Sequence, residues 1–173
     1  MCIFQAMNLY ILRHGIAVEP GTPGYEKDSD RPLIPKGRRQ LKQIAGAMKR
    51  MDLRFDLVVS SPLLRAEQTA EIITGSLKLE ARSRISDALK PDGNPITLVR
   101  QLNELNPVPE AALLVGHQPN LSRLISLLTA GDTDLVVDLK KGGLCKLEAA
   151  SLQPGRCAML TWLLTPKQMR WMA

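Results

Sequence analysis

The stretch Met7-Asn8-Leu9-Tyr10-Ile11-Leu12-Arg13-His14-Gly15 decides how the rest of the chain is interpreted. Residues 7–12 are apolar nearly throughout, which is typical of a strand buried on both faces in the middle of a sheet. The apolar run then stops at an arginine, a histidine and a glycine. This pattern predicts that Arg13 and His14 lie at the carboxyl end of a central strand.

Outward from this stretch, short apolar runs alternate with longer amphipathic segments, as is typical of α/β proteins. Strands are predicted at 56–60, 79–85, 111–115, 136–139, 143–149 and 157–164. Helices are predicted at 35–51 and 96–105, from Ser61-Pro62, from Pro119 and at the end of the chain. The last three strands look like an antiparallel addition. The predicted fold is a three-layer α/β/α arrangement with a mainly parallel central sheet that carries an antiparallel strand.

The length of 173 residues fits one domain, 1–173, in which residues 1–6 could be a short extension because Met7 would also serve as a start. The formal charge of +6 indicates an affinity for anions, which could be nucleic acid, acidic protein surfaces or phosphorylated groups. Aromatic residues make up only 3% and no long Lys/Arg run occurs, so we expect no nucleic-acid partner.

The three cysteines, Cys2, Cys145 and Cys157, have no close spacing and form neither a zinc pattern nor a disulfide framework. We interpret them as reduced thiols, which predicts a cytoplasmic protein. The uncharged residues 1–12 are too few to span a bilayer, so we expect no membrane association.

The two histidines of the chain occupy the same kind of position. His14 and His117 each follow a buried apolar strand, and ligands of open α/β sheets bind beyond the carboxyl ends of the strands. If the sheet is parallel there, the two imidazoles converge. The simpler alternative for either histidine alone is a polar residue where the chain surfaces.

Two arginines strengthen the case for a site. Arg65 is predicted in the first turn of a helix, where a cation is mildly unfavourable unless an anion binds nearby. Arg13 directly follows an apolar strand and also needs a partner, which a phosphate would provide. A solvated arginine is the alternative in both cases.

Two imidazoles and two guanidiniums near helix N-termini would bind a dianion. Phosphoryl transfer needs mainly positioning and charge neutralisation, and a neutral imidazole can attack phosphorus to form a phosphohistidine. Two isolated histidines without clustered carboxylates or thiols make no credible metal site, so we expect neither a metal nor another cofactor.

The residues 12–15 resemble the Arg-His-Gly signature of the histidine phosphatase superfamily, whose fold is phosphoglycerate mutase-like. Residues 60–70 and 115–119 resemble its second and third motifs in order and spacing. The resemblance implies that His14 is the nucleophile, and that Arg13, Arg65 and His117 bind the phosphoryl group and stabilise the transition state. It also places Gly15 beside the substrate.

Within the superfamily, the chain is most similar to the SixA branch of phosphohistidine phosphatases. It is short, residues 30–33 with Gly37 resemble the branch pattern after the first strand, and residues 89–93 resemble its Leu-x-Pro-x-Gly loop. Arg31 would then face the phosphate or form a structural ion pair. The chain departs from the branch at Ile34, which leaves the next helix without its usual N-cap, and at Gln118, where an acidic residue is common.

The predicted function is metal-independent hydrolysis of phosphohistidine on a protein, such as a histidine phosphorelay domain in signal transduction. Asp92 is the candidate general acid, with Asp87 in the same stretch. If neither residue acts as the general acid, the lack of one favours phosphohistidine as the substrate, because an imidazole leaving group needs less acid catalysis than an alkoxide. The alternatives are a phosphatase of small sugar, nucleotide or isoprenoid phosphates, and a non-catalytic phosphate or nucleic-acid binding module.

Overall fold

A computed structural model describes residues 7–79 and 81–173, so the possible extension at 1–6 and Cys2 lie outside the described residues. The strands are β1 (Met7–Arg13), β2 (Leu57–Ser60), β3 (Arg82–Ile85), β4 (Ala111–Gly116), β5 (Leu144–Ala149) and β6 (Ala158–Leu164). The helices are α1 (Pro35–Arg50), α2 (Leu64–Leu77), α3 (Pro95–Asn103), α4 (Asn120–Thr129) and α5 (Pro166–Trp171), with short 3-10 turns η1 (Asp28–Asp30) and η2 (Asp87–Leu89).

The strands form one six-stranded sheet in the order β3-β2-β4-β1-β5-β6. Strands β1 to β4 are mutually parallel, and β5 and β6 are antiparallel additions on the far side of β1. The predicted α/β class with a mainly parallel sheet is therefore confirmed. Because β1 and β4 pair in parallel from Asn8 with Ala111 to Arg13 with Gly116, their carboxyl ends finish side by side.

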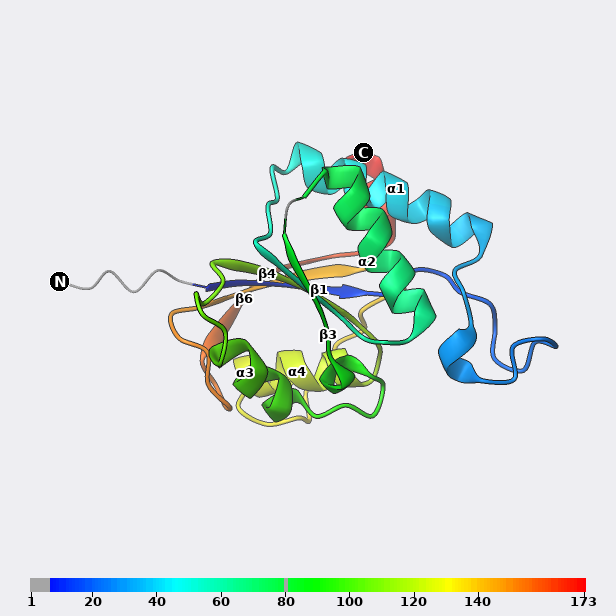
Figure 1. Ribbon diagram of the computed structural model, residues 1–173. Coiled ribbons are helices and arrows are strands. Elements are labelled where there is room, and N and C mark those ends of the chain that lie inside the picture. The colour runs from blue at the N-terminus through cyan, green and yellow to red at the C-terminus, as the bar shows by residue number, and fades with distance from the viewer. Residues whose placement is uncertain (1–6, 80) are drawn as a thin grey trace.

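Helices cover both faces of the sheet, with α1 and α2 on one side and α3 and α4 on the other (Figure 1). Successive residues of β1 point to opposite faces, so Leu9 and Ile11 join the core under α3 and α4, whereas Tyr10 and Leu12 join the core under α1 and α2. Within 7–79 and 81–173, no helix has the length and apolar character that crossing a membrane requires.

Two predicted elements are wrong. Residues 136–139 form no strand: Val136 is exposed, and the Val137 carbonyl accepts a hydrogen bond from the Gln118 side chain instead of from a neighbouring strand. Helix α2 begins at Leu64 rather than at Ser61-Pro62, and Leu63 stands at its N-cap position without a side-chain cap. The Ser61 hydroxyl contacts His117 instead.

Candidate active site

A cleft of about 450 Å³ opens beyond the carboxyl ends of β1 and β4. The predicted residues His14, His117, Arg13, Arg65 and Arg31 all line it. The remaining lining residues are Glu19, Pro20, Asp28, Pro91, Gln118 and Lys141. The parallel pairing of β1 with β4 brings the first and third sequence motifs together, and α2 supplies Arg65 from the adjacent β2 connection.

The imidazole of His14 is buried and held in one orientation. Its Nδ1 lies 2.7 Å from the Gly15 carbonyl oxygen. A carbonyl can only accept a hydrogen bond, so Nδ1 carries the proton and the neutral ring keeps its lone pair on Nε2. Burial, and then the neighbouring His117, lower the pKa of His14 from 6.5 to about 2. The side chain is therefore a neutral imidazole with a free basic nitrogen.

His117 lies directly beside it, with the two ring centroids 4.8 Å apart. Its Nε2 is 2.9 Å from the Ser61 hydroxyl, and its Nδ1 is buried without a hydrogen-bond partner within 7–79 and 81–173. Burial and the positive charge of Arg65 lower its pKa to about 3, although Asp28 acts in the opposite direction. An anion in the cleft would favour protonation of this ring and would accept its unpartnered hydrogen.

Arg13 is fixed by the segment that follows α4. Its Nη1 donates to the Leu139 carbonyl oxygen at 2.9 Å, whereas its buried Nε has no hydrogen-bond partner in the part of the chain that the structure describes. Burial lowers the pKa of Arg13. The residues predicted as a strand at 136–139 thus serve to orient this guanidinium by a backbone carbonyl.

Arg65 and Arg31 are both bound to one carboxylate, that of Asp28 in η1. Arg65 is only 3% exposed; its Nη2 donates to Asp28 Oδ2 at 2.8 Å and its Nη1 to the Asp28 backbone carbonyl at 2.7 Å. The Nε and Nη2 of Arg31 donate to Asp28 Oδ1. These two arginines lower the pKa of Asp28, although its partial burial acts in the opposite direction. Arg31 therefore both lines the cleft and forms an ion pair.

The predicted general acids do not reach the cleft. Asp92 and Asp87 are exposed, neither lines the cleft, and Asp87 pairs with Lys90. Pro91 is the residue of this loop that does line it. Gly15 contributes its carbonyl to His14, and its N–H donates to the Thr69 hydroxyl rather than toward the cleft.

Sequence reasoning missed three charged residues of the cleft: Asp28, Glu19 and Lys141. Glu19 and Lys141 form an ion pair of 3.4 Å between two loops that are distant in the sequence. Glu19 and Asp28 stand in a long stretch rich in glycine, proline and aspartate, which singles out neither of them, and Lys141 follows the residues predicted as a strand without any such signal.

The cleft suits an anion of two negative charges. Four cationic side chains and two carboxylates line it, so with both imidazoles neutral its net charge is +2. Three buried polar atoms of the site have no hydrogen-bond partner among the residues that the structure describes: Arg13 Nε, Arg65 Nε and His117 Nδ1. Within the described residues, no group of three or more His, Cys, Asp or Glu side chains could hold a metal ion. The arrangement can bind a phosphoryl group and present His14 Nε2 to it.

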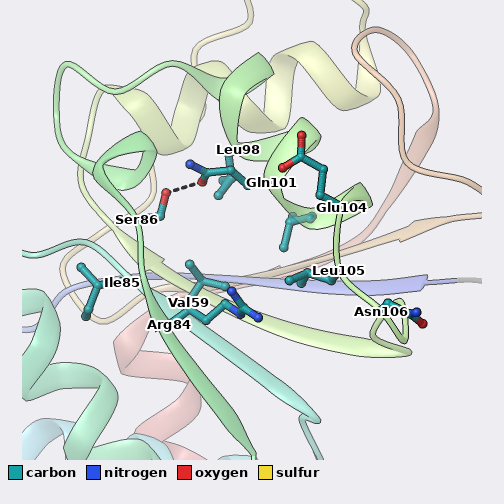
Figure 2. A pocket seen from close by; sticks show the side chains of 10 residues that line it. Val59, Arg84, Ile85, Ser86, Leu98, Gln101, Glu104, Leu105 and Asn106 are labelled. Carbon is teal, nitrogen blue, oxygen red and sulfur yellow. Dashed lines mark hydrogen bonds between the residues drawn. The ribbon is translucent and has the colours of Figure 1, made fainter.

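A second cavity, of about 340 Å³, lies between β3 and α3 and has a different character (Figure 2). Leu98, Leu102 and Val59 line it together with Arg84 and Glu104, and the Ser86 hydroxyl hydrogen-bonds with Gln101 at 2.6 Å. It contains no histidine, and its single arginine is accompanied by a glutamate. It therefore lacks the nucleophile and the excess of positive charge found beyond β1.

Comparison with known proteins agrees with this geometry. The profile of the Histidine phosphatase superfamily (branch 1) matches residues 9–90. An uncharacterised protein of Picosynechococcus sp. is 37% identical over 164 residues, which are 93% of this chain and 98% of that protein. Phosphohistidine phosphatase SixA of Escherichia coli K12 is 30% identical over 128 residues, which are 73% of this chain and 77% of SixA. A solved structure of the protein histidine phosphatase SixA complexed with tungstate superposes with a TM-score of 0.79 at 26% identity, covering 93% and 98% of the two chains.

Proposed function

Because the chain belongs to the histidine phosphatase superfamily and is a phosphatase of the SixA type, we propose that it hydrolyses phosphohistidine on a protein through a covalent intermediate on His14. The observation that carries the proposal is the orientation of His14: Nδ1 is committed to the Gly15 carbonyl, so the lone pair of Nε2 is free in a cationic cleft. A relative named phosphohistidine phosphatase supports the substrate class.

The first chemical step is an in-line displacement at phosphorus. His14 Nε2 donates its lone pair to form a new P–N bond while the P–N bond of the substrate breaks, and the departing imidazole nitrogen keeps that electron pair and takes a proton from water. The proton stays on His14 Nδ1 and is donated in a hydrogen bond to the Gly15 carbonyl oxygen, which stabilises the positive character of the phosphorylated ring. The dephosphorylated partner then leaves.

In the second step, a water oxygen attacks the phosphoryl group. The bond from phosphorus to His14 Nε2 breaks, its electron pair returns to that nitrogen, and the attacking water loses its proton to solvent. The products are orthophosphate and the neutral His14 with which the cycle began. No metal is required at any point, because arginines and imidazole neutralise the charge.

The other side chains bind the phosphoryl oxygens. Among the described residues, the buried Nε–H groups of Arg13 and Arg65 and the Nδ1 of His117 have no hydrogen-bond partner. An anion provides acceptors for all three, and protonated His117 then stabilises the equatorial oxygens as charge develops. Asp28 holds Arg31 and Arg65 in place, so it acts as a positioning residue rather than as an acid, because its pKa is lowered.

The position of Asp92 and Asp87 outside the cleft supports phosphohistidine over an alkyl phosphate. An alkoxide leaving group needs a proton donor, whereas imidazole, with a conjugate acid of pKa ~6.5, leaves more easily. A role in phosphorelay signalling and a cytoplasmic location would accompany this substrate, and both stay predictions.

The decisive experiment compares substrates in EDTA. Phosphohistidine peptide and p-nitrophenyl phosphate are given to the wild-type protein and to His14→Ala, and orthophosphate release is followed. We expect much faster release from phosphohistidine and none above background from the variant. Equal rates on both substrates would favour a phosphatase of small phosphomonoesters, and full activity in His14→Ala would overturn the mechanism.

A further inference from the structure

Helix α1 concentrates positive charge. It contains six lysines and arginines and no aspartate or glutamate, in a chain whose formal net charge is +6. All six cations are exposed. The ion pairs found within 7–79 and 81–173 involve other lysines and arginines, so none of the six is neutralised there. The six like charges on this helix repel one another, and binding of an acidic surface would relieve that repulsion.

The helix begins directly beside the segment Gly15-Ile16, which follows His14. The Ile34 N–H donates to the Ile16 carbonyl, and a Cβ on Gly37 would lie only 2.1 Å from that carbonyl oxygen. Leu41 of the next turn lies against Gly15. Figure 1 shows the start of α1 at the end of the sheet where β1 finishes. A partner on the first two turns of α1 would therefore be adjacent to the cleft that contains His14.

One face of these turns is hollowed. Lys36, Arg39, Gln40 and Gln43, spaced as one helix face, form a pocket of about 380 Å³ together with Ile16 and with Arg170 of α5. Within the described residues, three cations and no carboxylate line this basic hollow, and the Oε1 atom of Gln40 is buried without a hydrogen-bond partner. Arg38 and Lys42 belong to the same turns but do not line the hollow.

We propose that the basic hollow docks an acidic surface patch of the phosphoprotein substrate, next to the phosphohistidine that enters the cleft. This inference rests on the proposed function. The cleft would bind the phosphoryl group, and the basic hollow would bind the protein that carries it. Charge complementarity selects an acidic partner, because three cations converge without a carboxylate. A protein is favoured over single-stranded nucleic acid because no aromatic side chain lines the hollow to stack a base.

The test separates docking from chemistry with two double variants of equal charge. Lys36→Gln/Arg39→Gln removes two positive charges from the basic hollow. Arg38→Gln/Lys42→Gln also removes one lysine and one arginine, but from the other side of the same helix turns. Substrates are free phosphohistidine and a purified phosphotransfer domain, phosphorylated on a histidine flanked by aspartates and glutamates. A second form of that domain has these carboxylates replaced by amides.

We expect kcat/KM on the acidic domain to fall about tenfold in Lys36→Gln/Arg39→Gln, mainly through KM, and to stay within about twofold in Arg38→Gln/Lys42→Gln. Activity on free phosphohistidine should be unchanged in both, and the amide form of the domain should lose the difference. Thermal unfolding of the variants checks that they fold. Equal losses in the two double variants would overturn the proposal, since they would reflect net charge alone, as would equal losses on free phosphohistidine.

Direct binding keeps this test independent of catalysis. The affinity of the unphosphorylated acidic domain for the wild-type protein should fall as the salt concentration rises. At low salt, its affinity for the Lys36→Gln/Arg39→Gln variant should be several-fold lower than for the wild-type protein. The binding measurement does not depend on turnover. If the wild-type protein hydrolyses neither substrate, the proposed function is wrong, and the binding result still tests the docking proposal. Binding of an oligonucleotide that depends on Lys36 and Arg39, without binding of the domain, would overturn the proposal in favour of a nucleic-acid surface.

Discussion

The two histidines of the cleft follow the same local pattern and have different surroundings. His14 directly follows β1 and His117 directly follows β4, and their rings are neighbours. His14 is bound to a backbone carbonyl of the next residue, which fixes its tautomer. His117 contacts the Ser61 hydroxyl, which can donate or accept, and its charge responds to Asp28.

This difference indicates different chemical roles. A ring with a fixed tautomer and a very low pKa is a constant nucleophile, ready at every physiological pH. A ring with an adaptable partner and a nearby carboxylate can change protonation when an anion enters the cleft. The local sequence places an imidazole at a strand end, whereas its neighbours decide what that imidazole does.

The largest effect should come from removal of the nucleophile. His14→Ala is expected to lower kcat by about 10⁴-fold or more and to abolish the acid-labile phosphoenzyme, because the other neutral imidazole, His117, pairs with a hydroxyl that does not fix its tautomer. Rapid acid-free quench with labelled substrate measures both quantities. If the variant still forms a phosphohistidine, then His117 can replace His14 as the nucleophile, and the two rings do not have different roles.

Removal of the second ring should be less severe. His117→Gln is expected to lower kcat by about 10²- to 10³-fold, since it removes charge stabilisation rather than the bond-forming atom. The phosphoenzyme on His14 should still form, more slowly, in single-turnover measurements. Complete loss of labelling with normal binding of orthophosphate would assign the nucleophile to His117.

Both rings should make stability depend on pH in the same direction. Their pKa values are lowered to about 2 and about 3, so below pH 6.5 the unfolded chain binds protons that the folded chain does not. The free energy of unfolding should therefore fall as pH falls from 6.5 toward 4.5, with a slope of up to about 2.7 kcal/mol per pH unit for two protons. Urea unfolding at several pH values measures it, and His14→Asn and His117→Asn should each remove about half of the slope.

Asp28→Asn should affect the site through the arginines and His117. It removes the negative charge and one of the two carboxylate oxygens that accept from Arg31 and Arg65, while the backbone carbonyl of residue 28 still accepts from Arg65, and we expect kcat to fall about tenfold. KM should not rise, because the cleft gains a positive charge. The matched control is Asp30→Asn, an exposed carboxylate of the same turn that bonds only the Ser29 hydroxyl within the described residues. A rise in KM together with loss of thermal stability would indicate a purely structural role.

The smallest effect is expected from the partner of His117. Ser61→Ala removes the hydrogen bond to His117 and the longer one that the hydroxyl accepts from the Leu63 N–H, which should lower kcat about fivefold and shift the pH profile of the phosphoenzyme hydrolysis step. Ser60→Ala is the control, because its hydroxyl bonds the Ser61 carbonyl and not the ring. Identical pH profiles for Ser61→Ala and the wild-type protein would mean that the hydroxyl does not tune His117.

Much of the fold follows from local pattern. The apolar runs predict β1, β2, β4, β5 and β6 within a few residues, and for β1, β2 and β4 the reason is that burial on both faces leaves little choice of residue. The strand predicted at 136–139 fails for a non-local reason: the Gln118 side chain and Arg13 use the carbonyls of Val137 and Leu139, which the alternation of residues cannot reveal.

The sequence by itself determined that His14, Arg13, Arg65 and His117 would meet, because strand ends and helix starts are local features and parallel strands finish at one edge. Only the tertiary structure decided that Asp28 binds Arg31 and Arg65, that Leu139 orients Arg13, and that Asp92 stays outside. These contacts join loops to residues far away in the chain. Their geometry depends on how the whole core packs, and no short-range pattern of residue types encodes it.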